Sequence, residues 1–114
     1  MIRIFVNLPE FDKRWKELSL DDNDLKELQF NLLTDPKKGA VIKGTGRLRK
    51  IRFAFENRGK SGSIRVLYVD FSEYKKIYLI TAYTKNEKDN ISQSEANQIK
   101  KLIDVLETEL KDRS

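Results

Sequence analysis

The fold is decided by a stretch of the chain that begins with GTGRLRKIRFAFENRGKSGSIRVLYV, residues Gly44 to Val69. Apolar residues alternate with other residues in this segment, which is typical of β-strands. The first alternating stretch is LRKIRFAF, residues 48–55, and the second is IRVLYVDF, residues 64–71. Successive side chains of a strand point to opposite faces of a sheet. If the apolar residues of the first stretch enter the core, Lys50 and Arg52 must point out from the other face.

The position of Arg65 is left open by the same pattern. In the second stretch, the residues that point to one face and those that point to the other are both largely apolar. Alternation alone therefore does not say on which face of the sheet Arg65 lies. If Arg65 lies on the open face with Lys50 and Arg52, three cations lie within a few ångströms, since neighbouring strands are only about 4.8 Å apart. Like charges crowded in this way are unfavourable without an anion, and the pattern therefore points to a function.

The positive charge of the chain is concentrated in this region. The formal net charge is +5, but residues 43–65 carry eight lysines and arginines against Glu56 alone. The remaining residues carry 15 bases and 17 acids, a net charge of −2. Such a basic segment is typical of a surface that binds a polyanion. A solvated loop with ordinary ion pairs, in which Arg52 or Arg65 binds Asp70, Glu73 or Glu87, would give the same composition.

The composition also excludes several kinds of site. The chain has no cysteine and no histidine, which excludes disulfides, thiolate chemistry, a Ser-His-Asp triad and imidazole metal ligands. We therefore expect no metal and no cofactor, and any acid–base catalysis must use Lys, Arg, Tyr, Asp or Glu. The length of 114 residues predicts a single domain, 1–114. Without a signal peptide or an apolar run of about 20 residues, we expect a cytoplasmic protein with no membrane contact.

The remaining segments predict an α+β fold. We expect a strand over residues 2–6, a helix over 9–18, a second helix from an N-cap at Ser19 to the Asp35–Pro36 dipeptide, and a buried strand over 77–83. Residues 37–46 are predicted as a loop. Short links join the last three strands, which predicts an antiparallel meander. A capping box from Ser92 to Glu95 opens the final helix, so the predicted order is β-α-α-β-β-β-α with the helices packed on one sheet.

Three stretches of this sequence resemble a known family. GRLRKIRF, RGKSGSIRVLYV and IYLITAYTKNEKDNIS are similar to the HigB-type branch of the RelE/ParE toxin superfamily, from bacterial toxin–antitoxin pairs, and the match is densest from Gly46 to Glu95. The resemblance implies a RelE-like fold with a mainly antiparallel sheet, an N-terminal helix hairpin and a C-terminal helix. It also implies a type II toxin that acts as a metal-independent, ribosome-dependent mRNA endoribonuclease, in which the 2′-OH attacks the adjacent phosphate.

The resemblance further implies partners and site residues. The implied partners are a helix-turn-helix antitoxin of the HigA type, the ribosome and mRNA, with operator DNA contacted only through the antitoxin. The family's usual tyrosine is missing, because Ile91 falls near its place, and Tyr83 is a candidate to replace it. A lysine beside other cations has a depressed pKa and can then act as a base. The catalytic residues carried over are Lys50, Arg52, Arg65 and Lys85, and the RNA-binding residues are Arg49, Arg58, Lys60, Tyr83 and Glu87.

Two alternatives from other functional classes remain open. A non-enzymatic, ParE-like toxin would act by binding gyrase, but that branch generally lacks the basic residues found here. A plain RNA-binding module would need exposed aromatic residues for stacking, whereas Phe53 and Phe55 are expected in the core. Cleavage of RNA is the property that separates the first interpretation from both alternatives.

Overall fold

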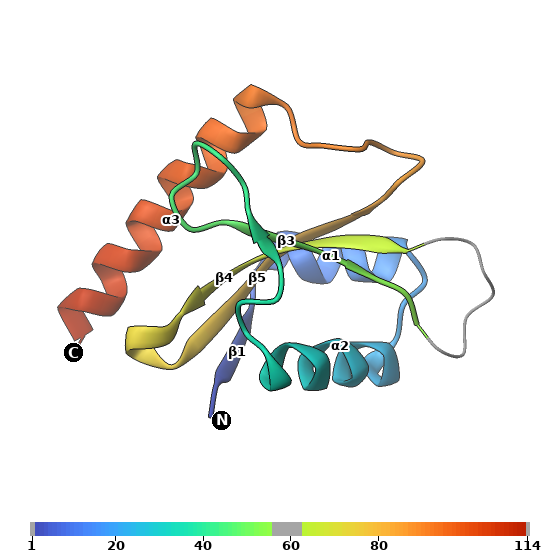
Figure 1. Cartoon of the computed structure of the whole chain (residues 1–114), viewed down its shortest axis with the longest axis horizontal. Coiled ribbons are helices and arrows are strands. Elements are labelled where there is room, and N and C mark those ends of the chain that lie inside the picture. The colour runs from blue at the N-terminus through green and yellow to red at the C-terminus, as the bar shows by residue number, and fades with distance from the viewer. Residues whose placement is uncertain (1, 56–62, 114) are drawn as a thin grey trace.

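The computed structural model describes residues 2–55 and 63–113, which form an α+β fold (Figure 1). The order of elements follows the prediction, with a short additional strand and a 3₁₀ turn. In chain order the elements are β1 (Ile4–Asn7), α1 (Pro9–Glu17), α2 (Asp22–Thr34), β2 (Ala40–Val41), β3 (Arg49–Phe53), β4 (Ile64–Phe71), the 3₁₀ helix η1 (Ser72–Tyr74), β5 (Lys76–Thr84) and α3 (Gln93–Arg113).

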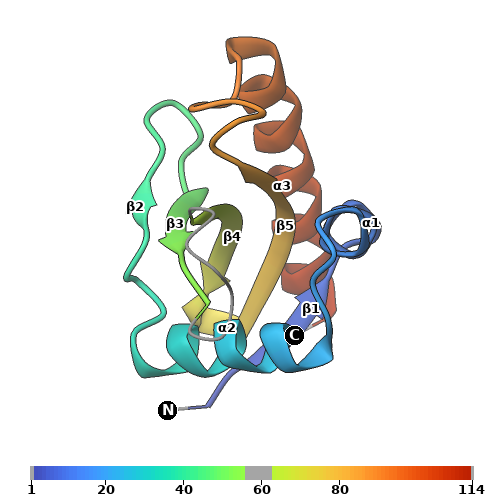
Figure 2. The same ribbon diagram turned by 90° about the vertical axis from the view of Figure 1, so that its right-hand side faces the viewer.

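The strands form a five-stranded sheet in the order β1-β5-β4-β3-β2 (Figure 2). Strands β3, β4 and β5 form the predicted antiparallel meander, and β2 extends it by pairing antiparallel with β3. Strand β1 is parallel to β5. The two helices after β1 carry the chain back across the sheet, so that β3 and β5 run in the same direction as β1. The sheet is therefore mixed but mainly antiparallel, as predicted.

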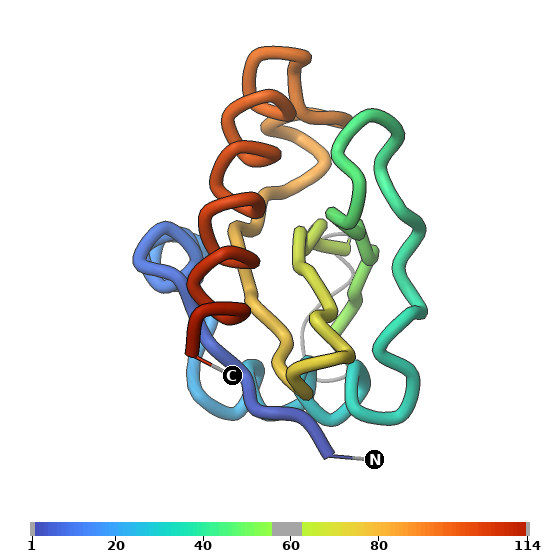
Figure 3. Tube along the Cα trace, turned by 90° about the vertical axis from the view of Figure 1, so that its left-hand side faces the viewer, coloured from blue at the N-terminus to red at the C-terminus, as the bar shows by residue number. Residues whose placement is uncertain are grey.

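Helices cover both faces of the sheet and give it two hydrophobic cores. On one face, Phe11 and Trp15 of α1 and Leu28 and Leu32 of α2 pack against the odd-numbered residues of β3, such as Ile51. On the other face, α3 packs along β4 and β5 (Figure 3). Every residue of β4 is buried, which explains why its sequence shows no alternation between apolar and polar residues.

The turn between α1 and α2 differs from the prediction, because Asp21 and not Ser19 caps α2. Ser19 has a positive φ of 59° and ends α1 in a Schellman motif, in which the Leu20 amide donates to the Trp15 carbonyl and the Ser19 amide to the Lys16 carbonyl. The Asp21 side chain accepts from the Asp24 amide at 2.9 Å, and Asp24 reciprocates. The sequence SLDDND contains two overlapping capping patterns, and the end of α1 occupies the first of them.

Strand β2 lies inside the segment that was predicted as a loop. The Tyr68 hydroxyl fixes this segment, since it accepts from the Gly39 amide and donates to the Pro36 carbonyl, both at 2.9 Å. A Cβ at Gly39 would lie 2.9 Å from both the Lys50 carbonyl oxygen and the Tyr68 ring. Glycine is therefore required for β2 to approach β3 beside Lys50.

Candidate functional site

The strand register brings three of the predicted site cations to one face of the sheet. Arg52 of β3 lies directly opposite Arg65 of β4, and Arg65 lies directly opposite Tyr83 of β5. Directly paired residues project from the same face, and Lys50 shares that face because it is two residues from Arg52. The register thus answers the question that the sequence left open, and it places Arg65 with Lys50 and Arg52.

This cation cluster, which we define as Lys50, Arg52, Arg65 and the neighbouring Tyr83, lies on the α3 side of the sheet. Tyr83 and Leu67, a paired neighbour of Lys50, belong to the hydrophobic core under α3. Arg65 and Tyr83 are buried, with 6% and 2% of their surfaces exposed, whereas Arg52 is exposed. The cluster therefore runs from the solvent to the edge of the α3 core.

Two polar atoms in the cation cluster are buried without a hydrogen-bond partner. Within the described part of the chain, these are Nε of Arg65 and the hydroxyl oxygen of Tyr83. Arg65 uses Nη1 to donate to the carbonyl and the hydroxyl of Ser63, at 3.1 and 3.3 Å. A buried polar group without a partner costs roughly 1–3 kcal/mol, and both groups can donate a hydrogen bond, which is what the oxygen atoms of an anion accept. Burial also raises the pKa of Tyr83, so its hydroxyl stays protonated at neutral pH.

The surroundings of Lys50 favour the neutral form of its amine. Partial burial lowers the pKa of Lys50, and the charges of Arg52 and Arg65 lower it further, while Asp89 acts in the opposite direction. The Nζ atom of Lys50 donates to the Asn90 side-chain oxygen at 2.9 Å. An amine with a lowered pKa is a better proton acceptor near neutral pH than an ordinary lysine.

The three carboxylates that the sequence offered as partners of Arg52 and Arg65 are bound elsewhere. Among residues 2–55 and 63–113, no ion pair includes Lys50, Arg52 or Arg65. The acids considered above as their partners each bind another arginine: Asp70 binds Arg3, Glu73 binds Arg47 and Glu87 binds Arg14. The interpretation of Arg52 and Arg65 as members of ordinary ion pairs with these acids is therefore wrong.

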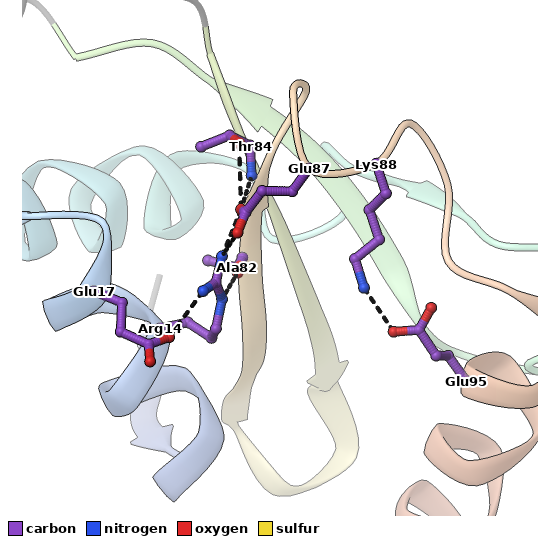
Figure 4. A network of polar contacts seen from close by, with 7 residues as sticks. All are labelled: Arg14, Glu17, Ala82, Thr84, Glu87, Lys88 and Glu95. Atoms are coloured by element: carbon purple, nitrogen blue, oxygen red, sulfur yellow. Dashed lines mark hydrogen bonds and ion pairs between the residues drawn. The ribbon is translucent and has the colours of Figure 1, made fainter.

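A network of polar contacts holds the end of β5 and the start of the connection that follows it (Figure 4). Strand β1 pairs with β5 only as far as Leu79. Beyond this point, Nε of Arg14 donates to the Ala82 carbonyl at 2.9 Å, and the Glu87 carboxylate accepts from the Thr84 amide at 2.8 Å. Arg14 and Glu87 also bind each other through two hydrogen bonds. The hydrogen bond from the Thr84 amide is the largest cause of the lowered pKa of Glu87. Burial acts in the opposite direction, and the hydrogen bond from Arg14 lowers the pKa further.

The same connection is fixed to α3 on its other side. Lys88 donates to Glu95 at 2.6 Å and lies 5.2 Å above the centre of the Tyr83 ring. Glu95 accepts from the Ser92 amide, and the Ser92 hydroxyl accepts from the Glu95 amide, which confirms the predicted capping box. Residues 85–92 are thereby held between α1 and α3, next to the cation cluster.

The other predicted site residues do not join the cation cluster in this way. Alternation places Arg49 on the opposite face, where Nη1 donates to the carbonyls of Gly39 and Lys37 at 2.7 and 3.2 Å. Glu87 faces Arg14, as described above. Lys85 follows β5 directly and is exposed. Arg58 and Lys60 lie outside the described residues.

A hollow of about 400 Å³ lies beside the cluster, between α1, β5 and α3. Its wall includes Tyr83 and Lys88 but none of Lys50, Arg52 and Arg65, so these three cations do not line the hollow. Sequence reasoning missed Asn90, Arg14 and Lys88, because only the folded chain shows which side chains they contact.

Within the described ranges, no group of three or more acidic residues is placed to hold a metal, and no helix is long and apolar enough to cross a membrane.

The sequence and the fold are both similar to those of known proteins. A family model described as "RelE toxin of RelE / RelB toxin-antitoxin system" matches residues 2–113. Among solved structures, a mutant of the E. coli toxin RelE in the free state is similar, with a TM-score of 0.56 and 17% sequence identity. That match covers 77% of this chain and 88% of the other. At such low identity the structural match supports the fold alone, whereas the family match extends over nearly the whole chain.

Proposed function

The chain belongs to the RelE toxin family of toxin–antitoxin systems, and we propose that it is a type II toxin that cuts mRNA on the ribosome. The observation that carries this proposal is that two buried atoms of the cation cluster, Nε of Arg65 and the hydroxyl of Tyr83, have no hydrogen-bond partner among the described residues. They lie beside Lys50 and Arg52, which no described carboxylate neutralises. A phosphodiester has the charge and the oxygen atoms that such a site requires.

The proposed reaction is transphosphorylation. Lys50, whose pKa is lowered by burial and by the charges of Arg52 and Arg65, takes the proton from a ribose 2′-OH, and the 2′ oxygen attacks the adjacent phosphorus. The bond between phosphorus and the 5′ oxygen breaks, which leaves a 2′,3′-cyclic phosphate and a 5′-OH. Arg65 and Arg52 donate to the non-bridging oxygens, where negative charge develops. Two groups are candidates for protonating the leaving oxygen: Tyr83, which burial keeps protonated, and Lys85.

The remaining proposed contacts follow from position. We assign Arg58 and Lys60 to the RNA backbone, because they belong to the same basic segment of the sequence. We leave Arg49 and Glu87 out of the RNA surface, because Arg49 is on the other face and Glu87 is bound to Arg14 and Thr84. The proposed partners are a HigA-like antitoxin, the ribosome and mRNA, and the proposed location is the cytoplasm, where translation takes place.

The direct test is to map new mRNA 5′ ends in a reconstituted translation reaction. We expect the wild-type chain to produce new ends with free 5′-OH groups, and only when ribosomes are present. Arg65→Ala should reduce the cleavage rate by about 100- to 1000-fold, the effect of losing one donor to a developing charge. Arg113→Ala, at the end of α3, is the matched control. Unchanged ends with Arg65→Ala, or inhibition of gyrase without new ends, would count against the proposal.

A further inference from the structure

Residues 85–92 bring a neutral amide to the cation cluster. Asn90 lies 40 positions along the chain from Lys50, yet its side-chain oxygen accepts a hydrogen bond from Lys50 Nζ at 2.9 Å. Within the connection, Glu87 is bound to Arg14 of α1 and to the Thr84 amide, and Lys88 is bound to Glu95 of α3 (Figure 4). The contact between Asn90 and Lys50 is therefore made by a segment that is fixed to two helices.

We propose that Asn90 is a positioning residue for Lys50, holding its amine over the face that it shares with Arg52, Arg65 and Tyr83. This inference rests on the proposed function, because it assigns Lys50 as the group that accepts the 2′-OH proton. An amide oxygen binds one hydrogen of the amine and fixes its direction, so that the remaining lone pair is directed by the protein instead of rotating freely. Asn90 itself does not contact the reacting atoms.

The chemical identity of residue 90 matters as much as its position. An amide oxygen carries no net charge, so it holds Lys50 without offsetting the repulsion from Arg52 and Arg65. A carboxylate at the same place would form an ion pair with the ammonium and keep Lys50 protonated. Asp89, the adjacent residue, has that charge, but Asn90 makes the hydrogen bond.

The charged and titratable groups on the described segments around Lys50 come from three strands, from the connection after β5 and from α3. Arg52 lies on the same strand, Arg65 on β4, and Tyr83 on β5. Asp89 comes from the connection to α3, and Glu95 of α3 is bound to Lys88. Strand β2 contributes no charge, because Ala40 is the residue paired with Lys50. Among the described groups, the two arginines act against protonation of Lys50, and Asp89 acts for it.

The test combines Asn90→Asp with a matched control. Asn31→Asp changes the charge equally at another Lys–Asn hydrogen bond, between Lys38 Nζ and Asn31 at 3.0 Å on α2. We expect the acid limb of the pH–rate profile to lie about 1 to 3 pH units higher in Asn90→Asp than in the wild type. At pH values on the acid side of that limb, Asn90→Asp should cleave about 10- to 1000-fold more slowly than the wild type, and its rate should recover at high pH. Asn31→Asp should leave the profile unchanged.

Two further measurements separate positioning from a general loss of structure. Asn90→Leu keeps the size but removes the acceptor, and it should lower the plateau rate by up to about 100-fold without moving the limb upward. An NMR titration of the Lys50 side chain, which needs no activity, should show a higher pKa in Asn90→Asp than in the wild type. An unchanged Lys50 titration in Asn90→Asp would overturn the inference. A wild-type chain that cuts no mRNA would overturn the proposed function, while the titration would still decide whether Asn90 positions Lys50.

Discussion

Arg52 and Arg65 face each other directly across neighbouring strands, on the side of the sheet that α3 covers. Two guanidinium groups in direct cross-strand positions repel each other, which destabilises the folded state. A chain selected only for stability would place an opposite charge or an apolar residue at one of these positions. The pair is the kind of local conflict that is found at functional sites.

Removing one member of this pair should therefore stabilise the fold and abolish the activity. We expect Arg65→Met to raise the free energy of unfolding by about 1 kcal/mol, because it removes a buried, unpartnered Nε and the repulsion from Arg52. Urea denaturation measures the first effect, and mapping of mRNA ends measures the second. A variant that is clearly less stable than the wild type would show that Arg65 contributes to packing.

The hydroxyl of Tyr83 gives a narrower test of the same idea. Tyr83→Phe deletes a single buried oxygen that has no partner in the described structure. We expect the free energy of unfolding to rise by about 1 kcal/mol, since an unsatisfied polar group is removed, while mRNA cleavage slows. Tyr78→Phe is the control, because Tyr78 is also buried under α3 but is not in the cluster. Equal cleavage by Tyr83→Phe and the wild type would exclude a role for this hydroxyl in the reaction.

Glu87 is expected to act through the fold of residues 85–92. In Glu87→Ala, the Thr84 amide and Arg14 lose their shared acceptor, which should cost about 1 kcal/mol of stability and slow cleavage by loosening Asn90. Glu17→Ala is the matched control, because Glu17 is the other carboxylate bound to Arg14 but does not contact β5. Hydrogen exchange should show faster exchange of the Thr84 amide in Glu87→Ala only. Weaker RNA binding with unchanged exchange would instead favour a direct contact with RNA.

The pair formed by Arg47 and Glu73 should give the stability an acid dependence. The hydrogen bond from Arg47 is the largest cause of the lowered pKa of Glu73, about 2 in the folded state against an ordinary value of 4.5. A lowered pKa stabilises the fold above the ordinary value, and this contribution disappears as the pH falls from about 4.5 to about 2.

Glu73→Gln should therefore flatten the curve of unfolding free energy against pH in that window. Nearly half of the Glu73 side chain is exposed (46%), so the difference above pH 4.5 should be only about 0.2–1 kcal/mol and should shrink with added salt. Urea denaturation at several pH values measures it, with Glu109→Gln as the control. Parallel curves for the wild type and Glu73→Gln would contradict the assignment.

The sequence predicted the fold well where the pattern of one segment was sufficient. Alternation in β3 placed Lys50 and Arg52 on the face opposite Ile51, and the Ser92–Glu95 pattern located the start of α3. Two local predictions differed because neighbouring structure decided them: Ser19 ends α1 instead of capping α2, and Tyr68 fixes a loop so that β2 can form.

The candidate site was less predictable, because it depends on contacts between distant segments. Strand β4 is buried on both faces, so only its register with β3 and β5 shows that Arg65 joins Lys50. The hydrogen bond between Lys50 and Asn90 joins a residue that precedes β4 in the sequence to one that follows it. No regular spacing of residues in a strand or helix predicts such a contact. The resemblance implied Glu87 as an RNA-binding residue, but its carboxylate binds Arg14, which lies on the first helix.

The polar network at the end of β5 also affects how copies of this chain can meet. Among the described residues, no strand pairs with β5 beyond Leu79 on its β1 side, and an unpaired strand edge is a template for addition of a strand from another molecule. Arg14 occupies the Ala82 carbonyl and Glu87 occupies the Thr84 amide. An incoming strand would have to displace both side chains and break their ion pair, so this edge is protected against edge-to-edge aggregation.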